Sequence, residues 1–266
     1  ATVREVVDAI RATGDLPINI DLIYGLPRQT EASWTQTLEQ VIALRPSRLA
    51  VYGYAHVPWM KKHQVALERH EVPDDALRAT LNTLARERFD AAGYQAIGFD
   101  HYALPSDELA IAARGGSLNR NFMGYTTRRG LDLVALGVSG ISSVGGSYTQ
   151  NHKALTDWRA RVQAGEPSWF RGLVLTEDDR LRREAILELS CNFRLDLAQE
   201  RSGRPFSEHF VSELEAMATM RADGLVVQEG SILQITELGM PFVRNICMLF
   251  DQYLSPDSGG RFSRTS

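Results

Sequence analysis

The sequence predicts an α/β fold built from parallel βαβ units, followed by a small and mainly helical domain. Three apolar runs, at residues 18–24, 48–54 and 94–99, have the lengths and turn boundaries of strands. Helical patterns separate these runs, and such an alternation forms right-handed βαβ units in a parallel sheet or barrel. Beyond about residue 170 the alternation stops, which indicates a second domain.

The composition excludes several classes of protein. With 44% hydrophobic and 23% charged residues, the 266-residue chain resembles an ordinary globular protein. A net charge of -4 without a long basic run argues against a nucleic-acid surface. No run of 18 apolar residues occurs, so no membrane-spanning helix is expected, and the lack of a signal-peptide pattern favours the cytoplasm. A helical pattern from Val3 onward suggests that an upstream part precedes the chain.

The stretch from Ile18 to Pro27 is the most informative part of the chain. It reads as a strand covered on both faces, with Asp21 inside it and a Gly-Leu-Pro break at its end. Burying Asp21 would cost several kcal/mol unless donors or a cation meet it. In parallel α/β folds such a group near the end of a strand usually faces a ligand. A structural Asp21, paired with an arginine or with backbone amides, is the alternative.

Two helices are predicted between the strands. The first is capped by Thr30 and ends before Pro46, and the second opens at Asp74 and ends at Gly93. Their buried positions are expected to be Trp34, Leu38, Val41 and Leu44 in the first, and Leu77, Leu81, Leu84 and Phe89 in the second.

From about residue 100 onward the composition of the chain changes to polar and glycine-rich. Residues 131–143 read as another buried strand whose end turns small and polar, which suits a nearby ligand. After residue 170 we predict a capped helix from Thr176, a helix over 207–221, a hairpin over 224–235 and a helix over 239–254. This order resembles a winged helix, but it has no basic cluster for DNA. Residues 255–266 should form a disordered tail.

Cysteine usage argues against a thiolate metal site within the chain. Only Cys191 and Cys247 occur, and neither belongs to a Cys-x-x-Cys or Cys-x-x-x-Cys pattern. We expect both to be reduced and buried in helices.

Several blocks of sequence resemble one family, the oxygen-independent coproporphyrinogen III oxidases, which are radical S-adenosylmethionine enzymes of haem biosynthesis. The resemblance runs to about Leu254. The blocks that carry it are residues 19–27, 54–56, 100–103, 120–127, 191–196 and 244–248.

The resemblance implies an architecture. Residues 1–170 would be the C-terminal part of a partial (β/α) TIM-like radical S-adenosylmethionine barrel. Residues 171–254 would be the small helical, winged-helix-like domain. The family's cluster-binding cysteine motif would lie upstream of Ala1, so the chain alone is not expected to catalyse the reaction.

The resemblance also implies chemistry and partners. The family oxidatively decarboxylates coproporphyrinogen III to protoporphyrinogen IX, using a 4Fe-4S cluster, S-adenosylmethionine and a 5′-deoxyadenosyl radical. An electron donor of unknown identity is required. The protein is expected to be a cytoplasmic monomer, without nucleic-acid or membrane partners.

Matching the family blocks assigns roles to individual residues. Asp21, Ala55 and Ile141 are expected to line the S-adenosylmethionine site, and Arg120 is expected to bind a substrate carboxylate. No catalytic or metal-binding residue is assigned within the chain.

Two interpretations remain open for further residues near the expected cleft. His56, Asp100 and His101 could face the cleft or make structural hydrogen bonds, and Arg128 and Arg129 are expected to be solvated loop charges. Two other functions stay open. One is a related haem chaperone, against which the blocks 120–127 and 244–248 argue, and the other is a non-catalytic binding module built on the C-terminal domain.

Overall fold

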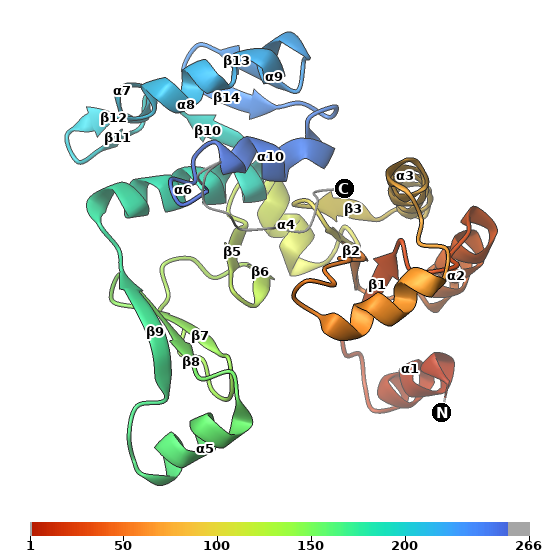
Figure 1. Cartoon of the computed structure of the whole chain (residues 1–266). Helices are drawn as coiled ribbons and strands as arrows, with labels where there is room; N and C mark the ends of the chain where they lie inside the picture. The colour runs from red at the N-terminus through yellow and green to blue at the C-terminus, as the bar shows by residue number, and fades with distance from the viewer. Residues whose placement is uncertain (1, 255–266) are drawn as a thin grey trace. The chain divides into compact units, whose positions relative to one another are not determined.

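The computed structural model describes residues 2–254 (Figure 1). Its internal contacts divide the chain into two units. The first unit contains residues up to Gly116 together with Met240–Asn245 and residues from Gln252. The second unit contains Ser117–Gly239 and Ile246–Asp251. The tail predicted at 255–266 lies outside the described residues. Within 2–254, no helix has both the length and the apolarity needed to cross a bilayer.

The first unit contains an open, mixed sheet of four strands. They are β1 (Asn19–Tyr24), β2 (Arg48–Gly53), β3 (Gln95–Ile97) and β4 (His101–Ala103), in the order β1-β2-β4-β3. β1 and β2 are parallel, as predicted, but β4 runs antiparallel to both of its neighbours. The predicted strand over 94–99 is confirmed in part: β3 is shorter and runs in the direction of β1 and β2, but it does not pair with β2. The chain turns at Gly98, which has a φ of 58°, and returns as β4, which lies between β2 and β3.

Two helices cover one face of this sheet. α2 (Glu31–Leu44) begins after the capping box of Thr30 and Ser33, and α3 (Asp75–Ala91) begins after Asp74, whose carboxylate accepts from the Leu77 amide. Most of the predicted stripe is buried, and Leu77 and Leu84 pack partly buried at its margin. The core also contains Leu22, Tyr24, Leu49 and Val51 from the strands.

A buried hydrogen bond joins the two helices. The indole nitrogen of Trp34 donates to the Leu81 carbonyl at 2.9 Å, so the largest core side chain is both packed and satisfied. The helices predicted from sequence on this side of the sheet are therefore confirmed.

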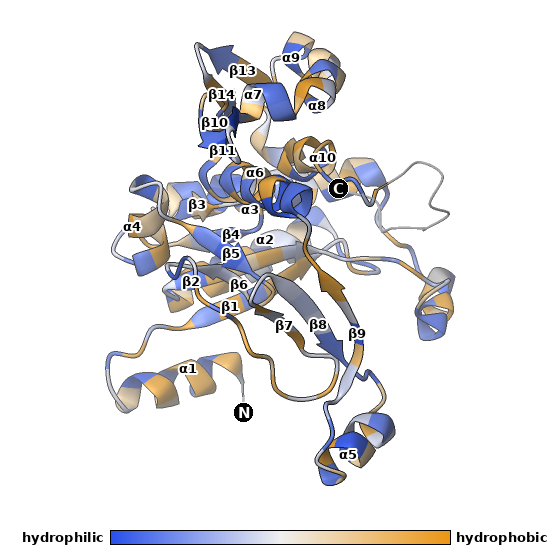
Figure 2. Ribbon diagram, turned by 90° about the vertical axis from the view of Figure 1, so that its left-hand side faces the viewer, coloured by the Kyte–Doolittle hydropathy of each residue, from blue (hydrophilic) through white to orange (hydrophobic). Residues whose placement is uncertain are grey.

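The other helices of the first unit are shorter or more exposed. α1 (Val3–Ala12) buries only Val7, so hydrophobic residues also occupy its exposed positions (Figure 2). The remaining helices of this unit are η1 (Lys62–Arg69), α4 (Glu108–Arg114) and η2 (Met240–Phe242). The helix α10 (Val243–Met248) follows η2 and is divided between the two units. The predicted helix over 239–254 is thus shorter than expected, and it begins as a 3₁₀ turn.

The first half of the second unit consists of antiparallel strands. β5 (Asn119–Asn121) pairs with β6 (Gly124–Thr126), and β7 (Ile141–Val144), β8 (Ser147–Asn151) and β9 (Trp169–Val174) form a three-stranded sheet. α5 (Leu155–Gln163) connects β8 to β9.

The predicted buried strand over 131–143 is wrong. Only its end belongs to a strand, and Leu131, Val134 and Leu136 are exposed, the last by 91%. Positive φ angles at Gly137 and Ser139 interrupt the extended backbone that a continuous strand would need.

The second half of this unit is helical with a small sheet. α6 (Glu177–Asn192) starts at the predicted capping box, in which Thr176 and Asp179 bond reciprocally. The predicted hairpin is β13 (Val226–Glu229) and β14 (Ile232–Ile235), and β10 (Arg194–Asp196) adds a third strand. β11 (Glu200–Arg201) pairs with β12 (Arg204–Pro205).

The predicted helix over 207–221 is broken into three pieces. They are α7 (Phe206–His209), α8 (Val211–Ala216) and α9 (Ala218–Ala222). Phe210 leaves the helical conformation between the first two, and its buried ring packs against Phe206 and Phe250 at 5.4 and 5.1 Å between centroids. Tertiary packing therefore outweighs local helix propensity there.

The Gly-Leu-Pro break after β1 has a clear structural cause. Gly25 has a φ of 79°, and its amide donates to the Gln29 side chain at 2.6 Å. The Arg78 side chain passes beside it and donates to the Tyr54 carbonyl at 2.7 Å. A Cβ at position 25 would lie 3.0 Å from the Arg78 guanidinium. Glycine is therefore favoured here both by conformation and by space.

We expect Gly25→Ala to destabilise the chain more than Gly93→Ala. Both substitutions place alanine at a positive φ, which costs roughly 1–2 kcal/mol. Only the first adds a contact with Arg78, since a Cβ at Gly93 meets nothing within 4 Å. Urea denaturation followed by tryptophan fluorescence measures both. Equal losses of unfolding free energy would show that the Arg78 contact has no effect.

Candidate functional site

Asp21 lies on the exposed face of β1. The strand alternates, with Leu22 and Tyr24 buried and Asn19, Asp21 and Ile23 exposed. The expectation of a strand covered on both faces, with a buried carboxylate, is wrong because α2 and α3 cover one face only. Among residues 2–254, the side chain of Asp21 has a single hydrogen bond, which the side-chain Nδ2 of Asn19 donates at 2.7 Å. Neither an arginine nor a backbone amide pairs with it, contrary to the structural alternative.

The face of the sheet that carries Asp21 continues to β4, although Ala50 on this face is fully buried. Asp21 is in register with Ala50 on β2, and Ala50 is in register with His101 on β4. Because cross-strand partners point to the same side, these three residues share a face. The ring of His101 also meets Tyr52 edge-on, with 6.0 Å between centroids.

His101 is held by Asp100. The buried Asp100 carboxylate contacts the His101 Nδ1 at 2.6 Å and accepts from Arg244 Nη2 at 3.0 Å. The Arg244 guanidinium also lies 4.4 Å from the centroid of the Phe99 ring. This supports a structural hydrogen-bonding role for Asp100. The link to Arg244 was not predicted, since 144 positions separate the two residues.

Ala55 is exposed directly after β2, in a loop held by one buried amide side chain. Gln64, from η1, donates to the Ala55 carbonyl at 3.0 Å and accepts from the Val57 amide at 2.7 Å. The Tyr54 amide donates to the Tyr24 carbonyl at 2.8 Å, which extends the parallel pairing to this point. The structure thus places Asp21 and Ala55 in the same unit, on neighbouring segments of chain. His56, next to Ala55, packs its ring against Tyr54 at 6.0 Å.

Arg120 is exposed on β5 in the second unit. Its guanidinium lies 5.7 Å from the ring centroid of Tyr125, its cross-strand partner, whose hydroxyl donates to the Ser190 carbonyl at 3.4 Å. The Tyr125 ring is thus anchored to α6 and supports the arginine.

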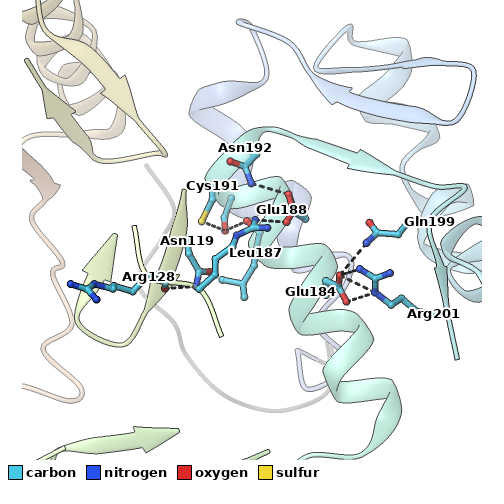
Figure 3. A network of polar contacts seen from close by, with 11 residues as sticks. Asn119, Arg128, Glu184, Leu187, Glu188, Cys191, Asn192, Gln199 and Arg201 are labelled. Carbon is cyan, nitrogen blue, oxygen red and sulfur yellow. Dashed lines mark hydrogen bonds and ion pairs between the residues drawn. The ribbon is translucent and has the colours of Figure 1, made fainter. Parts of the chain in front are cut away.

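The two neighbouring arginines differ from each other. Arg129 is an exposed loop residue, as expected, and it also pairs with Glu188 on α6 at 2.5 Å. Arg128 contributes its carbonyl, which accepts from the Asn119 side chain at 3.0 Å. Figure 3 shows this contact beside the polar side chains of α6, where Asn192 donates to Glu188 and Arg201 pairs with Glu184.

The two cysteines are free and buried, as predicted. Burial raises the pKa of the Cys191 thiol to about 11 and that of the Cys247 thiol to about 12. Cys247 Sγ also donates to the Ile186 carbonyl at 3.8 Å. Within the described part of the chain, no group of three or more His, Cys, Asp or Glu residues could hold a metal ion. These residues therefore do not fit an iron-sulfur cluster.

Ile141 lies at the start of β7 and borders a cavity of about 300 Å³ in the second unit. The Phe122 ring meets Tyr148 edge-on there, with 5.2 Å between centroids, and burial raises the pKa of Tyr148. Arg171 supplies a cation that the sequence analysis did not single out, because residues 169–174 carry no motif. The lining residues are Phe122, Ile141, Tyr148, Thr149, Gln150, Arg171, Gly172 and Leu173.

The family model of the HemN C-terminal domain matches residues 175–242. Three oxygen-independent coproporphyrinogen III oxidases are similar to the chain. The protein of Pseudomonas aeruginosa is 42% identical over 98% of this chain and 57% of the relative. The protein of Escherichia coli K12 is 43% identical over 92% of this chain and 54% of the relative. The protein of Thermostichus vulcanus is 40% identical over 98% of this chain and 81% of the relative. The chain thus spans little more than half of the first two relatives.

A solved structure resembles the chain as well. It is the coproporphyrinogen III oxidase of Escherichia coli, described as a radical SAM enzyme. The match has a TM-score of 0.85 and 39% identity, and covers 94% of this chain and 58% of the solved one.

Proposed function

Because the chain belongs to the family of oxygen-independent coproporphyrinogen III oxidases, we propose that it is part of an enzyme of haem biosynthesis. This radical SAM oxidoreductase would convert coproporphyrinogen III to protoporphyrinogen IX by oxidative decarboxylation. The observation that carries the proposal is identity of 40% over nearly the whole chain to a relative of which it covers 81%. The relatives compared are named oxidases, which favours this function over a haem chaperone or a non-catalytic binding module.

The exposed residues of the first unit fit S-adenosylmethionine. When bound, S-adenosylmethionine supplies the radical chemistry that removes hydrogen from a substrate propionate. Asp21 would accept hydrogen bonds from the ribose hydroxyls or the ammonium group, and its carboxylate lies open on the sheet face. Ala55 has a small, exposed side chain that lets a ligand approach the loop held by Gln64. For Ile141, which lies in the second unit, an apolar contact with S-adenosylmethionine is proposed from the family resemblance alone. The role of these residues is to bind and orient.

The ligands of the 4Fe-4S cluster are proposed to come from outside these 266 residues, because Cys191 and Cys247 are buried and too few. The reducing electron donor would likewise be a separate partner of unknown identity.

Arg120 is proposed to bind a propionate of coproporphyrinogen III. A guanidinium forms two parallel hydrogen bonds with a carboxylate, and Tyr125 supports the Arg120 side chain from one side.

We propose the finer architecture on similar grounds. Residues 1–170 would belong to a partial TIM-like barrel, supported by the parallel pairing of β1 with β2, and 171–254 to a winged-helix-like domain. The family match over 175–242 supports that boundary. We also propose that the protein is a monomer and that it works in the cytoplasm, and the two free cysteines are consistent with that compartment. A net charge of -4 does not favour a nucleic-acid or membrane partner.

The 266-residue chain, reconstituted anaerobically with iron and sulfide, is expected to hold no stoichiometric cluster. Two cysteines, both buried, are too few to supply the three thiolates that the cluster needs. Iron and sulfide analysis and electron paramagnetic resonance after reduction measure this. The double variant Cys191→Ser/Cys247→Ser should show the same background iron. A one-to-one cluster with a discrete signal would refute the expectation.

In the full-length enzyme, Asp21→Asn is expected to weaken S-adenosylmethionine binding while stability changes little. Losing a charge-assisted hydrogen bond costs about 1.5–3 kcal/mol, or roughly ten- to a hundred-fold in affinity. Calorimetric titration and the melting temperature measure both effects, with the exposed Asp8→Asn as control. Unchanged cofactor affinity with a large drop in melting temperature would favour a structural Asp21.

Arg120→Ala in the full-length enzyme is expected to raise the KM for coproporphyrinogen III roughly ten-fold or more, because a charged contact is lost. Affinity for S-adenosylmethionine should stay near the wild-type value. Arg120→Lys should recover part of the loss, since it keeps the charge without the planar fork. Arg204→Ala, an exposed arginine of β12, is the control. The assignment fails if substrate affinity survives, or if cofactor binding is lost with it.

A further inference from the structure

The Tyr54 side chain lies on the same face of the first unit's sheet as Asp21. The Tyr54 amide donates to the Tyr24 carbonyl at 2.8 Å, so the parallel pairing continues one residue beyond the end of β2. Along β2, Val51 belongs to the core under the helices, and Ala50 is in register with Asp21. Because side chains alternate along a strand, Tyr54 points to the side of Ala50 and Asp21.

The hydroxyl group of Tyr54 is buried without a hydrogen bond. Within residues 2–254, no protein group donates to its oxygen or accepts from it. Such a hydroxyl lowers the stability of the free protein, because it has lost its hydrogen bonds with water and gained none in return. Unsatisfied buried groups are rare in native proteins, and one explanation is a hydrogen bond that forms only when a ligand binds.

The fold holds Tyr54 in place without using its hydroxyl. The Tyr54 carbonyl accepts from Arg78 Nη1 at 2.7 Å, and the Tyr54 ring packs against the ring of His56. Tyr94 in the same unit differs, because its buried hydroxyl donates to the Pro46 carbonyl at 2.8 Å. The fold therefore accounts for the hydroxyl of Tyr94 but not for that of Tyr54.

The surroundings of Tyr54 belong to the proposed cofactor site. Ala55 follows it in the chain, and Asp21 is opposite Ala50, which lies four residues before Tyr54, or about 13 Å along the strand. The Asp21 carboxylate is an acceptor and so suits the donors of S-adenosylmethionine. A phenol hydroxyl can donate, and it suits the carboxylate of the cofactor, which is a charged acceptor.

We propose that Tyr54 is a further binding residue for S-adenosylmethionine, and that its hydroxyl donates a hydrogen bond to the carboxylate of this cofactor. The inference rests on the proposed function. Tyr54 is half-buried as a whole, and side-chain rotations on binding are common, so its hydroxyl can turn towards a ligand. Binding then satisfies a group that the free protein leaves without a partner, while Asp21 holds another part of the same molecule.

The test is Tyr54→Phe in the full-length enzyme with its cluster, because this change removes the hydroxyl and keeps the ring. Affinity for S-adenosylmethionine, measured by calorimetric titration, should fall roughly ten- to a hundred-fold. The melting temperature without S-adenosylmethionine should stay the same or rise, because the variant no longer buries an unsatisfied hydroxyl. A hydroxyl with a purely structural role would change the melting temperature in the opposite direction.

Tyr94→Phe is the matched control. It should lower the melting temperature by a few degrees, because the Pro46 carbonyl loses its donor, and leave affinity for S-adenosylmethionine near the wild-type value. A second ligand, decarboxylated S-adenosylmethionine, tests the group that is bound. Tyr54→Phe and the wild type should bind this analogue equally, because it has no carboxylate for the hydroxyl of Tyr54.

Four outcomes would overturn the inference. Tyr54→Phe could keep the wild-type affinity for S-adenosylmethionine, or it could lower the melting temperature as Tyr94→Phe does. It could also weaken the decarboxylated analogue as much as the cofactor, or weaken only coproporphyrin III, the oxidised analogue of the substrate. A wild-type enzyme that does not bind S-adenosylmethionine would instead refute the proposed function, so the two failures are distinguishable.

Discussion

The one-sided covering of the parallel pair β1–β2 is the constraint on which the first unit depends. α2 and α3 pack on one face, joined by the hydrogen bond from Trp34 to the Leu81 carbonyl. Removing that face from water orders the strands, because hydrophobic burial is the main favourable term in folding. The opposite face carries Asp21, which is exposed, and His101, which is partly exposed, so the core determines which side chains of these strands can meet a ligand.

Side-chain amides then position the ends of these strands. Gln29 holds the turn after β1, and Gln64 holds the loop after β2 through two backbone contacts. Such bonds satisfy backbone groups that leave the ladder, and they keep Ala55 in place without a bulky neighbour. The same principle appears at β4, where Asp100 is bonded by both His101 and Arg244.

The arginines of the second unit differ in the groups that they contact. Arg129 is neutralised by Glu188, and Arg120 lies against the Tyr125 ring. Arg171 is held by the neutral Gln150, so its positive charge remains uncompensated by any described carboxylate. These three guanidinium groups therefore lie in different electrostatic surroundings.

Local sequence was sufficient to predict those features that depend on interactions between residues close in the chain. The caps at Thr30, Asp74 and Thr176 fix where helices begin, because their side chains bond amides only a few residues away. The family was also identifiable from blocks of sequence alone. Tertiary structure decided the rest: the exposure of Asp21, the antiparallel turn of β4, the loop over 131–136 and the break at Phe210. Each depends on which distant segment covers a residue, and the periodicity of a single segment does not contain that information.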